Sequence, residues 1–134
     1  MNNAHAGVNA RDVYGATPLM LAVSYKMTQL SASLLNAWGG PRVLVDAAKP
    51  TGHNALFYAV AKKPADASIV KALLKRGADP NAALLTPDAA GYTPLHFACR
   101  FGEVKTAELL LDFGADPMAL SAGGETVLDA AKGQ

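Results

Sequence analysis

The sequence is poor in the residues that most often carry catalysis, disulfide bonding or metal binding. It contains one cysteine, three histidines and one tryptophan among 134 residues. A single cysteine cannot form a disulfide within the chain, which favours a reducing compartment, the cytoplasm or alternatively the nucleus. No stretch approaches the roughly 18 uninterrupted apolar residues that a membrane-spanning helix requires. We therefore expect no membrane insertion.

Charge of either sign is also scarce. Charged residues make up 17% of the chain and the formal net charge is +1, so no overall field attracts the chain to nucleic acid. Lys71, Lys75 and Arg76 form a small basic patch, and Lys62 and Lys63 precede it in the sequence. Because no aromatic residues are interleaved with it and no wider basic stripe exists, we expect no nucleic-acid partner.

Signatures of nucleotide binding and catalysis are missing as well. Neither the phosphate-binding loop G-x-x-x-x-G-K-[ST] nor the turn G-x-G-x-x-G occurs. Asp112 and Asp116, near Glu108, fit solvated charges on an outer helix face better than a carboxylate site. His5 and His53 lack metal-ligand spacing with the cysteine. We expect a protein with no enzymatic activity, no metal and no cofactor.

The sequence does contain a repeated pattern. Four stretches align in register through their glycines, at intervals of 37, 39 and 33 residues. These glycines are Gly15, Gly52, Gly91 and Gly124. Periods of about 20 to 50 residues are typical of solenoids, in which neighbouring units stack because one unit cannot bury its own apolar face. The pattern therefore predicts a stacked array.

The third unit shows most clearly how each repeat is built. Thr93 before Pro94 predicts a helix N-cap followed by proline at the first helical position. Gly102 predicts the end of this helix about two turns later. A second helix is expected in EVKTAELLLDFGADP, where Gly114 fits its C-terminal turn and Pro117 forbids continuation. The unit is thus predicted to be a helical hairpin with a turn-rich connector.

The other units repeat this plan with variations. Asn54 is predicted to cap a helix from Ala55 to about Ala61, and a second helix is expected from Ser68 to Arg76. In the first unit, the second helix is expected near residues 28–37. Extra residues around KKPADAS and in ALLTPDAAG should emerge as loops. Residues 38–52 form an irregular connector between the first two units.

The third unit resembles the ankyrin repeat. Its T-P-L-H-x-A stretch, residues 93–98, followed by Leu109–Leu111 and the turn at 114–116, matches the signature of that family and its period of about 33 residues. The resemblance extends from about Val8 to Lys132. It implies a single all-α ankyrin-repeat domain of about three and a half stacked helix-turn-helix repeats with short β-hairpin fingers. The repeats are expected at about 9–48, 49–87 and 88–120, with a partial repeat at 121–134.

The cysteine lies three residues after a histidine on the predicted first helix of the third unit. Residues three apart share a helix face, so His96 and Cys99 could act as a reactive pair. The resemblance implies instead that His96 is architectural, bonding local backbone and tying adjacent repeats together. Cys99 would then pack as a small hydrophobic residue. A nucleophilic dyad would also need an orienting group and an oxyanion site, and the sequence identifies neither.

The resemblance implies a function in protein–protein interaction, on a concave face lined by the fingers and the outer ends of the first helices. The register places six candidate partner-binding residues on this face: Tyr14, Tyr25, His53, Tyr92, Arg100 and Phe101. Tyrosine and arginine are frequent at binding hot spots because they bury much area and keep a polar handle. Alternatively, Tyr14, Tyr92 and Phe101 only pack against neighbouring fingers or repeats. Tyr58 aligns with Phe97 and is expected to be packed, outside the site.

Two other interpretations of function stay open. The chain could be the regulatory or targeting part of a longer protein whose enzyme or channel domain lies elsewhere, as the partial units at both ends suggest. It could also be a modification substrate, since Asn9 and Asn81 resemble finger asparagines that hydroxylases modify in this family. The main expectation is a monomer that binds a partner protein, whose identity the fold does not specify.

Overall fold

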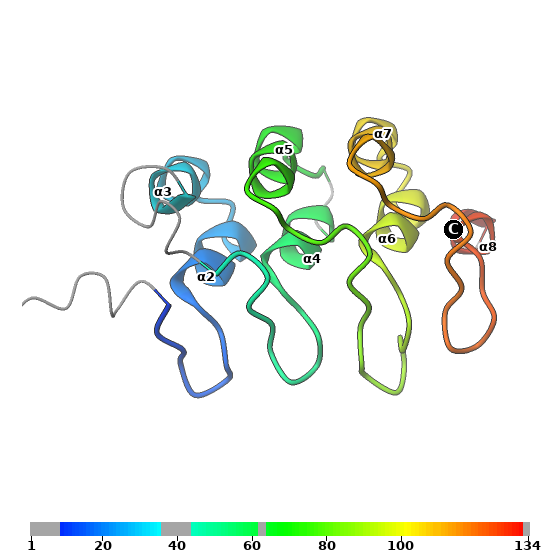
Figure 1. Ribbon diagram of the computed structural model, residues 1–134, viewed down its shortest axis with the longest axis horizontal. Helices are drawn as coiled ribbons and strands as arrows, with labels where there is room; N and C mark the ends of the chain where they lie inside the picture. The colour runs from blue at the N-terminus through cyan, green and yellow to red at the C-terminus, as the bar shows by residue number, and fades with distance from the viewer. Residues whose placement is uncertain (1–8, 36–43, 62–63, 133–134) are drawn as a thin grey trace, which may run out of the picture.

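The computed structural model describes residues 9–35, 44–61 and 64–132 (Figure 1). All regular elements in these ranges are helical. They are α2 (Pro18–Ser24), α3 (Thr28–Ser33), α4 (Ala55–Val60), α5 (Ala67–Lys75), α6 (Pro94–Arg100), α7 (Val104–Asp112) and α8 (Val127–Lys132). None of these helices is long and apolar enough to cross a membrane. Of the residues and ranges named above, His5, Val8, Lys62, Lys63 and residues 36–43 and 133–134 lie outside the described ranges.

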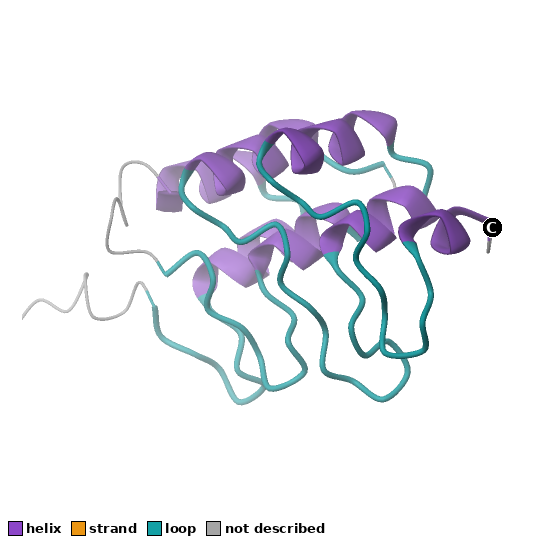
Figure 2. Cartoon of the chain, turned by 45° about the vertical axis from the view of Figure 1, so that its right-hand side comes forward, coloured by secondary structure: helices purple, strands orange, loops and turns teal. Residues whose placement is uncertain are grey.

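The helices form two layers, with loops projecting from one side. Helices α2, α4, α6 and α8 pack side by side in one row, while α3, α5 and α7 form the second row above it (Figure 1). Long loops, the fingers, extend from the row of α2, α4, α6 and α8 (Figure 2). The arrangement confirms the predicted solenoid of stacked helical hairpins, with a fourth unit represented by α8.

Each helix of the finger-side row begins at a side-chain N-cap. Thr17, Asn54 and Thr93 accept hydrogen bonds through their side-chain oxygens from backbone N–H groups three residues later, at 3.2, 3.0 and 3.4 Å. Thr126 caps α8 in the same way, at 3.0 Å. These caps satisfy N–H groups that lack partners in the first turn of a helix. The caps predicted at Asn54 and Thr93 are confirmed.

The fingers contain no β-strand in the described parts of the chain, although the resemblance implied short β-hairpins. In the first finger, Asp12 N–H donates to the Ala16 carbonyl at 2.9 Å and Gly15 N–H donates back to Asp12 at 3.0 Å. Lys49 and His53, and likewise Ser121 and Glu125, close the second and fourth fingers. Each of these fingers thus has one pair of backbone hydrogen bonds, which forms a tight turn but not the longer ladder of a β-hairpin.

The third finger is longer, as the extra residues in ALLTPDAAG predicted. Its closing bond runs from Leu84 N–H to the Tyr92 carbonyl at 2.9 Å, so it spans eight residues where the other fingers span four. Neighbouring fingers touch through their backbones, because Ala122 N–H donates to the Ala90 carbonyl at 2.8 Å. Gly91 has φ +81°, and a Cβ there would lie 2.6 Å from the Ala122 nitrogen. Glycine is therefore required at this point of close approach.

Equivalent leucines show how each unit covers the one before it. Leu19, Leu56 and Leu95 occupy the same position in successive finger-side helices and are at most 2% exposed. Leu128 occupies this position in α8 and is 68% exposed. In the second layer, Leu74 of α5 is 4% exposed, whereas its counterpart in α7 is 44% exposed. Stacking, and not the single hairpin, buries these side chains.

Candidate functional site

The histidine and cysteine of the third unit do not form a reactive pair. His96 is fully buried, and its Nδ1 accepts the Thr93 N–H at 3.1 Å. Its Nε2 therefore carries the proton and donates to the Glu125 carbonyl at 3.1 Å. Both ring nitrogens are occupied, and burial raises the pKa of the Cys99 thiol. This is the opposite of the shift that a nucleophilic cysteine needs, and it confirms the architectural role of His96.

Two of the six candidates, Tyr14 and Tyr25, line one groove between the first and second units. The groove has a volume of about 290 Å³ and is bounded by the first finger, α2, the start of the second finger and α4. We call it the tyrosine groove and define it by the residues Tyr14, Met20, Leu21, Tyr25, Lys49 and Tyr58. Tyr14 is 75% exposed and Tyr25 is 73% exposed.

Tyr14 is held by the turn of the first finger. One carboxylate oxygen of Asp12 accepts the N–H groups of Tyr14, at 2.8 Å, and Ala16, at 2.9 Å. The bonds from Ala16 and Tyr14 are the main reasons why the pKa of Asp12 is lowered. Arg11 donates to the Ala48 carbonyl at 2.7 Å, which ties the first finger to the second. The finger therefore presents the Tyr14 ring on a fixed backbone.

Tyr25 is positioned by the end of α2. It directly follows the last residue of the helix, and its N–H still donates to the Leu21 carbonyl at 3.0 Å. Lys26 then adopts a left-handed φ of +58°, which turns the chain toward α3. Both tyrosines that project into the groove thus come from local structures fixed by hydrogen bonds.

The far wall of the groove is built by Lys49 and Tyr58 of the second unit. Lys49 Nζ lies 5.1 Å from the centroid of the Tyr58 ring, a cation–π geometry. The His53 ring stacks on Tyr58 at 5.7 Å, and its Nδ1 lies 2.7 Å from Thr51 Oγ1. Burial, and secondarily the Lys49 charge, lower the pKa of His53. His53 therefore supports the groove wall as a neutral ring at neutral pH.

Sequence reasoning left Tyr58 outside the site, and the structure places it in the groove. The alignment with Phe97 correctly indicates a packed position, because Tyr58 is only half-buried and contacts the hydrophobic core. The available signal was the change from phenylalanine to tyrosine, which puts a hydroxyl on an otherwise apolar position. Lys49 was missed because it lies in the irregular connector, where the repeat pattern gives no register.

Tyr92, which sequence reasoning placed on the partner-binding face, is packed between fingers. It is 7% exposed, its hydroxyl donates to the Glu125 carboxylate, and its ring lies 4.8 Å from that of His96. Burial, followed by the contact with Glu125, raises the pKa of Tyr92. The position directly after each finger glycine is at least partly shielded from solvent. Its four occupants, Ala16, His53, Tyr92 and Glu125, are all buried or half-buried.

The last two candidates lie further along the array. Arg100 is exposed at the end of α6, and Phe101 is half-buried with its ring stacked 6.2 Å from that of Phe97. They are not part of the tyrosine groove. The structure thus separates the six candidates into an exposed pair in the groove, a supporting histidine, a packed tyrosine and a distant pair.

Two other polar residues singled out from the sequence, Arg76 and Asn81, form hydrogen bonds with neighbouring units. Arg76, from the expected basic patch, donates to the Leu35 carbonyl of the first unit. Asn81 accepts the Asp116 N–H at 2.7 Å and donates to the Gly114 carbonyl at 3.0 Å, so it joins consecutive units. Among the residues described, no three His, Cys, Asp or Glu side chains gather in a group that could hold a metal ion.

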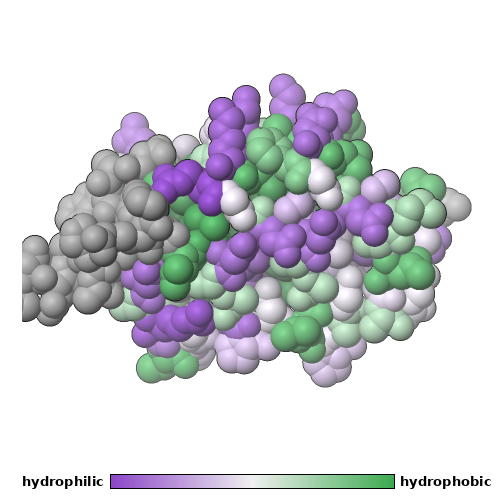
Figure 3. All heavy atoms as spheres, in the orientation of Figure 1, coloured by the Kyte–Doolittle hydropathy of each residue, from purple (hydrophilic) through white to green (hydrophobic). Residues whose placement is uncertain are grey.

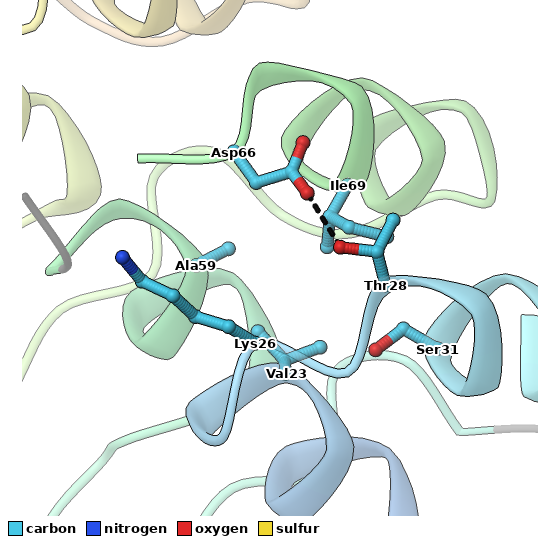
Figure 4. Close-up of a pocket in the computed structure, with 7 residues that line it drawn as sticks. All are labelled: Val23, Lys26, Thr28, Ser31, Ala59, Asp66 and Ile69. Atoms are coloured by element: carbon cyan, nitrogen blue, oxygen red, sulfur yellow. Dashed lines mark hydrogen bonds between the residues drawn. The ribbon is translucent and has the colours of Figure 1, made fainter. Parts of the chain in front are cut away.

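A small enclosed space between the first two units is not a ligand site. Val23, Ala59 and Ile69 give it an apolar lining, and Thr28 Oγ1 donates to Asp66 Oδ2 at 2.8 Å across one side (Figure 4). Its volume of about 20 Å³ is close to the minimum for one water molecule.

On the face seen in Figure 3, apolar and polar residues are interleaved over the described part of the chain, with apolar spots at the lower edge where the fingers lie.

The stacked hairpins and projecting fingers define a helical repeat protein. The family model for ankyrin repeats in three copies matches residues 1–84 and 43–121. The chain belongs to the ankyrin-repeat family. This family's repeats generally serve protein–protein interaction, and the repeat is a non-catalytic fold.

The chain matches a minor part of each of the following curated relatives. The chain is 39% identical over 85 residues to the ankyrin repeat and LEM domain-containing protein 1 homolog of Caenorhabditis elegans, covering 63% of the chain and 12% of that protein. It is 41% identical over 71 residues to the DNA-binding protein RFXANK of Mus musculus, covering 48% and 26%. It is 31% identical over 124 residues to the tyrosine-protein kinase Shark of Drosophila melanogaster, covering 92% and 12%. The chain thus spans 12% to 26% of these relatives.

Proposed function

We propose that the chain is a non-catalytic protein–protein interaction module that binds its partner in the tyrosine groove and along the first two fingers. The observation that carries this proposal is the pairing of Tyr14 and Tyr25, both about three-quarters exposed, in one groove. Their hydroxyls, and that of Tyr58, form no hydrogen bond with the described residues. Tyrosines in such settings supply large contact areas and a free polar group.

The rigidity of the groove supports the same proposal. Tyrosine side chains have only two rotatable χ angles, so they lose little conformational entropy when a partner binds. The Asp12 turn and the end of α2 hold the backbones of Tyr14 and Tyr25 in place before binding. Preorganised surfaces bind more tightly because less ordering is needed on association.

The proposal is tested by partner capture with matched variants. The double variant Tyr14→Ala/Tyr25→Ala removes both exposed rings, and Lys71→Ala/Lys105→Ala removes two exposed side chains from a second groove, between α5 and α7. Circular dichroism first shows that both variants are folded. We expect partners captured by the wild type and the lysine variant to be lost from the tyrosine variant. Equal capture by all three would contradict the proposal.

A second candidate function is regulation or targeting within a longer protein that carries an enzyme or channel domain. It is favoured by the relatives, of which the chain matches only a minor part, including one named as a tyrosine-protein kinase. The two functions are compatible, since the groove could then bind another part of the same protein. Detection of the protein in its source at a mass no larger than that of this chain would contradict the second candidate.

A further inference from the structure

We propose that the tyrosine groove binds an extended peptide segment in which a carboxylate side chain lies one or two positions from an apolar side chain. This inference rests on the proposed function and specifies the chemistry of the partner. In the bound state, the carboxylate contacts Lys49 Nζ and the apolar side chain lies on Leu21, between the Tyr14 and Tyr25 rings.

The charge of the groove favours an acidic segment. Lys49 Nζ lies over the Tyr58 ring and has no carboxylate within salt-bridge distance among the described residues. Asp12 is the only acidic residue that lines the described groove. One of its carboxylate oxygens accepts the Tyr14 and Ala16 N–H groups, and its charge interacts with that of Lys49 without forming a salt bridge. Arg11 adds a second positive charge at the base of the same finger, because its bonds are to neutral carbonyl oxygens. A partner carboxylate therefore complements the local charge.

The floor of the groove favours an apolar side chain next to that carboxylate. Met20 is 1% exposed and closes the bottom, while Leu21 is 38% exposed and faces the open space. A residue that covers Leu21 would also cover parts of the two exposed tyrosine rings, which are otherwise solvated. Removing apolar area from water stabilises the complex. The phenol groups around the floor remain available to donate hydrogen bonds to a carboxylate.

The shape of the groove suits an extended peptide. Its volume of about 290 Å³ lies at the lower limit of the roughly 300 to 1,000 Å³ of sites that enclose drug-sized ligands. It is long enough to run from the first finger past α2 to α4, and it accommodates one or two side chains. An extended segment places alternate side chains on one side and can satisfy both subsites from neighbouring positions.

The test uses a library of random heptapeptides displayed on phage, selected on the full chain. We expect the enriched sequences to carry Asp or Glu within two positions of Leu, Ile, Val, Pro or Phe. One enriched peptide and its Asp→Asn or Glu→Gln counterpart are then synthesised and titrated by fluorescence polarisation. Losing the charge should weaken binding about twofold to fivefold, as for a partly exposed charge pair, and the difference should shrink with added salt.

Variants of the protein assign the effect to Lys49. Lys49→Met keeps the apolar stem and removes the charge, so it should bind the acidic peptide and its amide counterpart with equal affinity. Lys49→Glu should shift selection from the library toward basic peptides. The fold should persist, because Lys49 closes the second finger through its backbone N–H. The control Lys105→Met lies in the groove between α5 and α7 and should bind like the wild type.

The outcomes separate this inference from the proposed function. Enriched peptides that lack carboxylates but lose binding to Tyr25→Ala would overturn the inference and leave the groove as the binding site. Unchanged discrimination in Lys49→Met would overturn it in the same way. Peptides that bind Tyr14→Ala/Tyr25→Ala as tightly as the wild type would contradict both the inference and the proposed function.

Discussion

His96 Nε2 lies 3.1 Å from the Glu125 carbonyl oxygen, a contact that joins the third unit to the fourth across 29 residues of sequence. The other ring nitrogen accepts the Thr93 N–H, which fixes the tautomer that makes this contact possible. The histidine thus links the start of α6 to the base of the next finger. Stacking of the last two units depends on a polar contact as well as on apolar burial.

Replacing His96 with phenylalanine should destabilise the protein strongly. The variant His96→Phe keeps a ring of similar size but leaves the buried Thr93 N–H without its partner, while the Glu125 carbonyl keeps only the Ser121 N–H. An unsatisfied buried group costs about 1–3 kcal/mol, so we expect the free energy of unfolding to fall by about 1–3 kcal/mol in urea titrations. A variant as stable as the wild type would contradict the architectural role of His96.

Two finger glycines with the same backbone angle should respond differently to alanine. Gly91 and Gly124 both have φ +81°, but a Cβ at Gly91 would lie 2.6 Å from the Ala122 nitrogen, whereas nothing lies within 4 Å of one at Gly124. Gly124→Ala should cost only the left-handed conformation, about 1 kcal/mol. Gly91→Ala should cost about 1–3 kcal/mol more, since the fingers must separate. Equal losses in chemical denaturation would show that the fingers are not in close contact.

Two leucines at the same helical position should also lose different amounts of stability when replaced with alanine. Leu95 and Leu128 occupy the same helical position, but the first is 2% exposed and the second 68%. Leu95→Ala should lower the free energy of unfolding by about 2–5 kcal/mol, as for other buried leucines. Leu128→Ala should change it by less than about 0.5 kcal/mol. A large loss from Leu128→Ala would mean that another surface covers α8 in solution.

Mild acid should destabilise the groove wall through His53. Its pKa is lowered in the folded protein, mainly by burial, from an ordinary value of 6.5. Between its folded and unfolded pKa values, the unfolded chain binds more protons, so acid favours unfolding. The stability that neutral His53 contributes is complete above pH 6.5 and is lost as pH falls through the folded pKa. The pKa values of Asp12 and Asp66 are lowered from 3.8, so these two groups change stability mainly below pH 3.8, outside this window.

Urea titrations at pH 7.5, 6 and 5 measure this dependence. We expect stability to decline toward pH 5 in the wild type and to decline less in His53→Gln, which keeps a polar side chain near Thr51 but cannot take up a proton in this range. The same slope in both proteins would show that His53 is not the responsible group.

The repeat plan was predictable because it depends on local sequence. The caps at Asn54 and Thr93 follow from residues adjacent to each helix, and the finger glycines fix the register from unit to unit. The role of His96 followed from the T-P-L-H stretch, which is complete only in the third unit. Local signals of this kind persist in the fold because neighbouring units stack without distorting them.

The residues of the tyrosine groove were only partly predictable because the groove depends on contacts between units. Tyr92 borders the finger tip in sequence, but the fourth finger covers its ring and supplies Glu125 as a partner. Tyr58 and Lys49 belong to the second unit, and they complete a groove whose other wall is the first unit. No single repeat contains this information. Tyr14 and Tyr25 were predicted to face outward from the register of the repeat, and both are exposed in the structure.

Site-specific photocrosslinking from the tyrosine groove tests most directly whether a partner binds there. p-Benzoylphenylalanine is placed at Tyr25 in one protein and at Lys105 of α7 in another, and each folded protein is irradiated in an extract of its source. If the partner binds in the tyrosine groove, we expect a discrete crosslinked partner from Tyr25, competed away by excess unlabelled wild type but not by Tyr14→Ala/Tyr25→Ala. A partner crosslinked from Lys105 and not from Tyr25 would contradict binding in the groove.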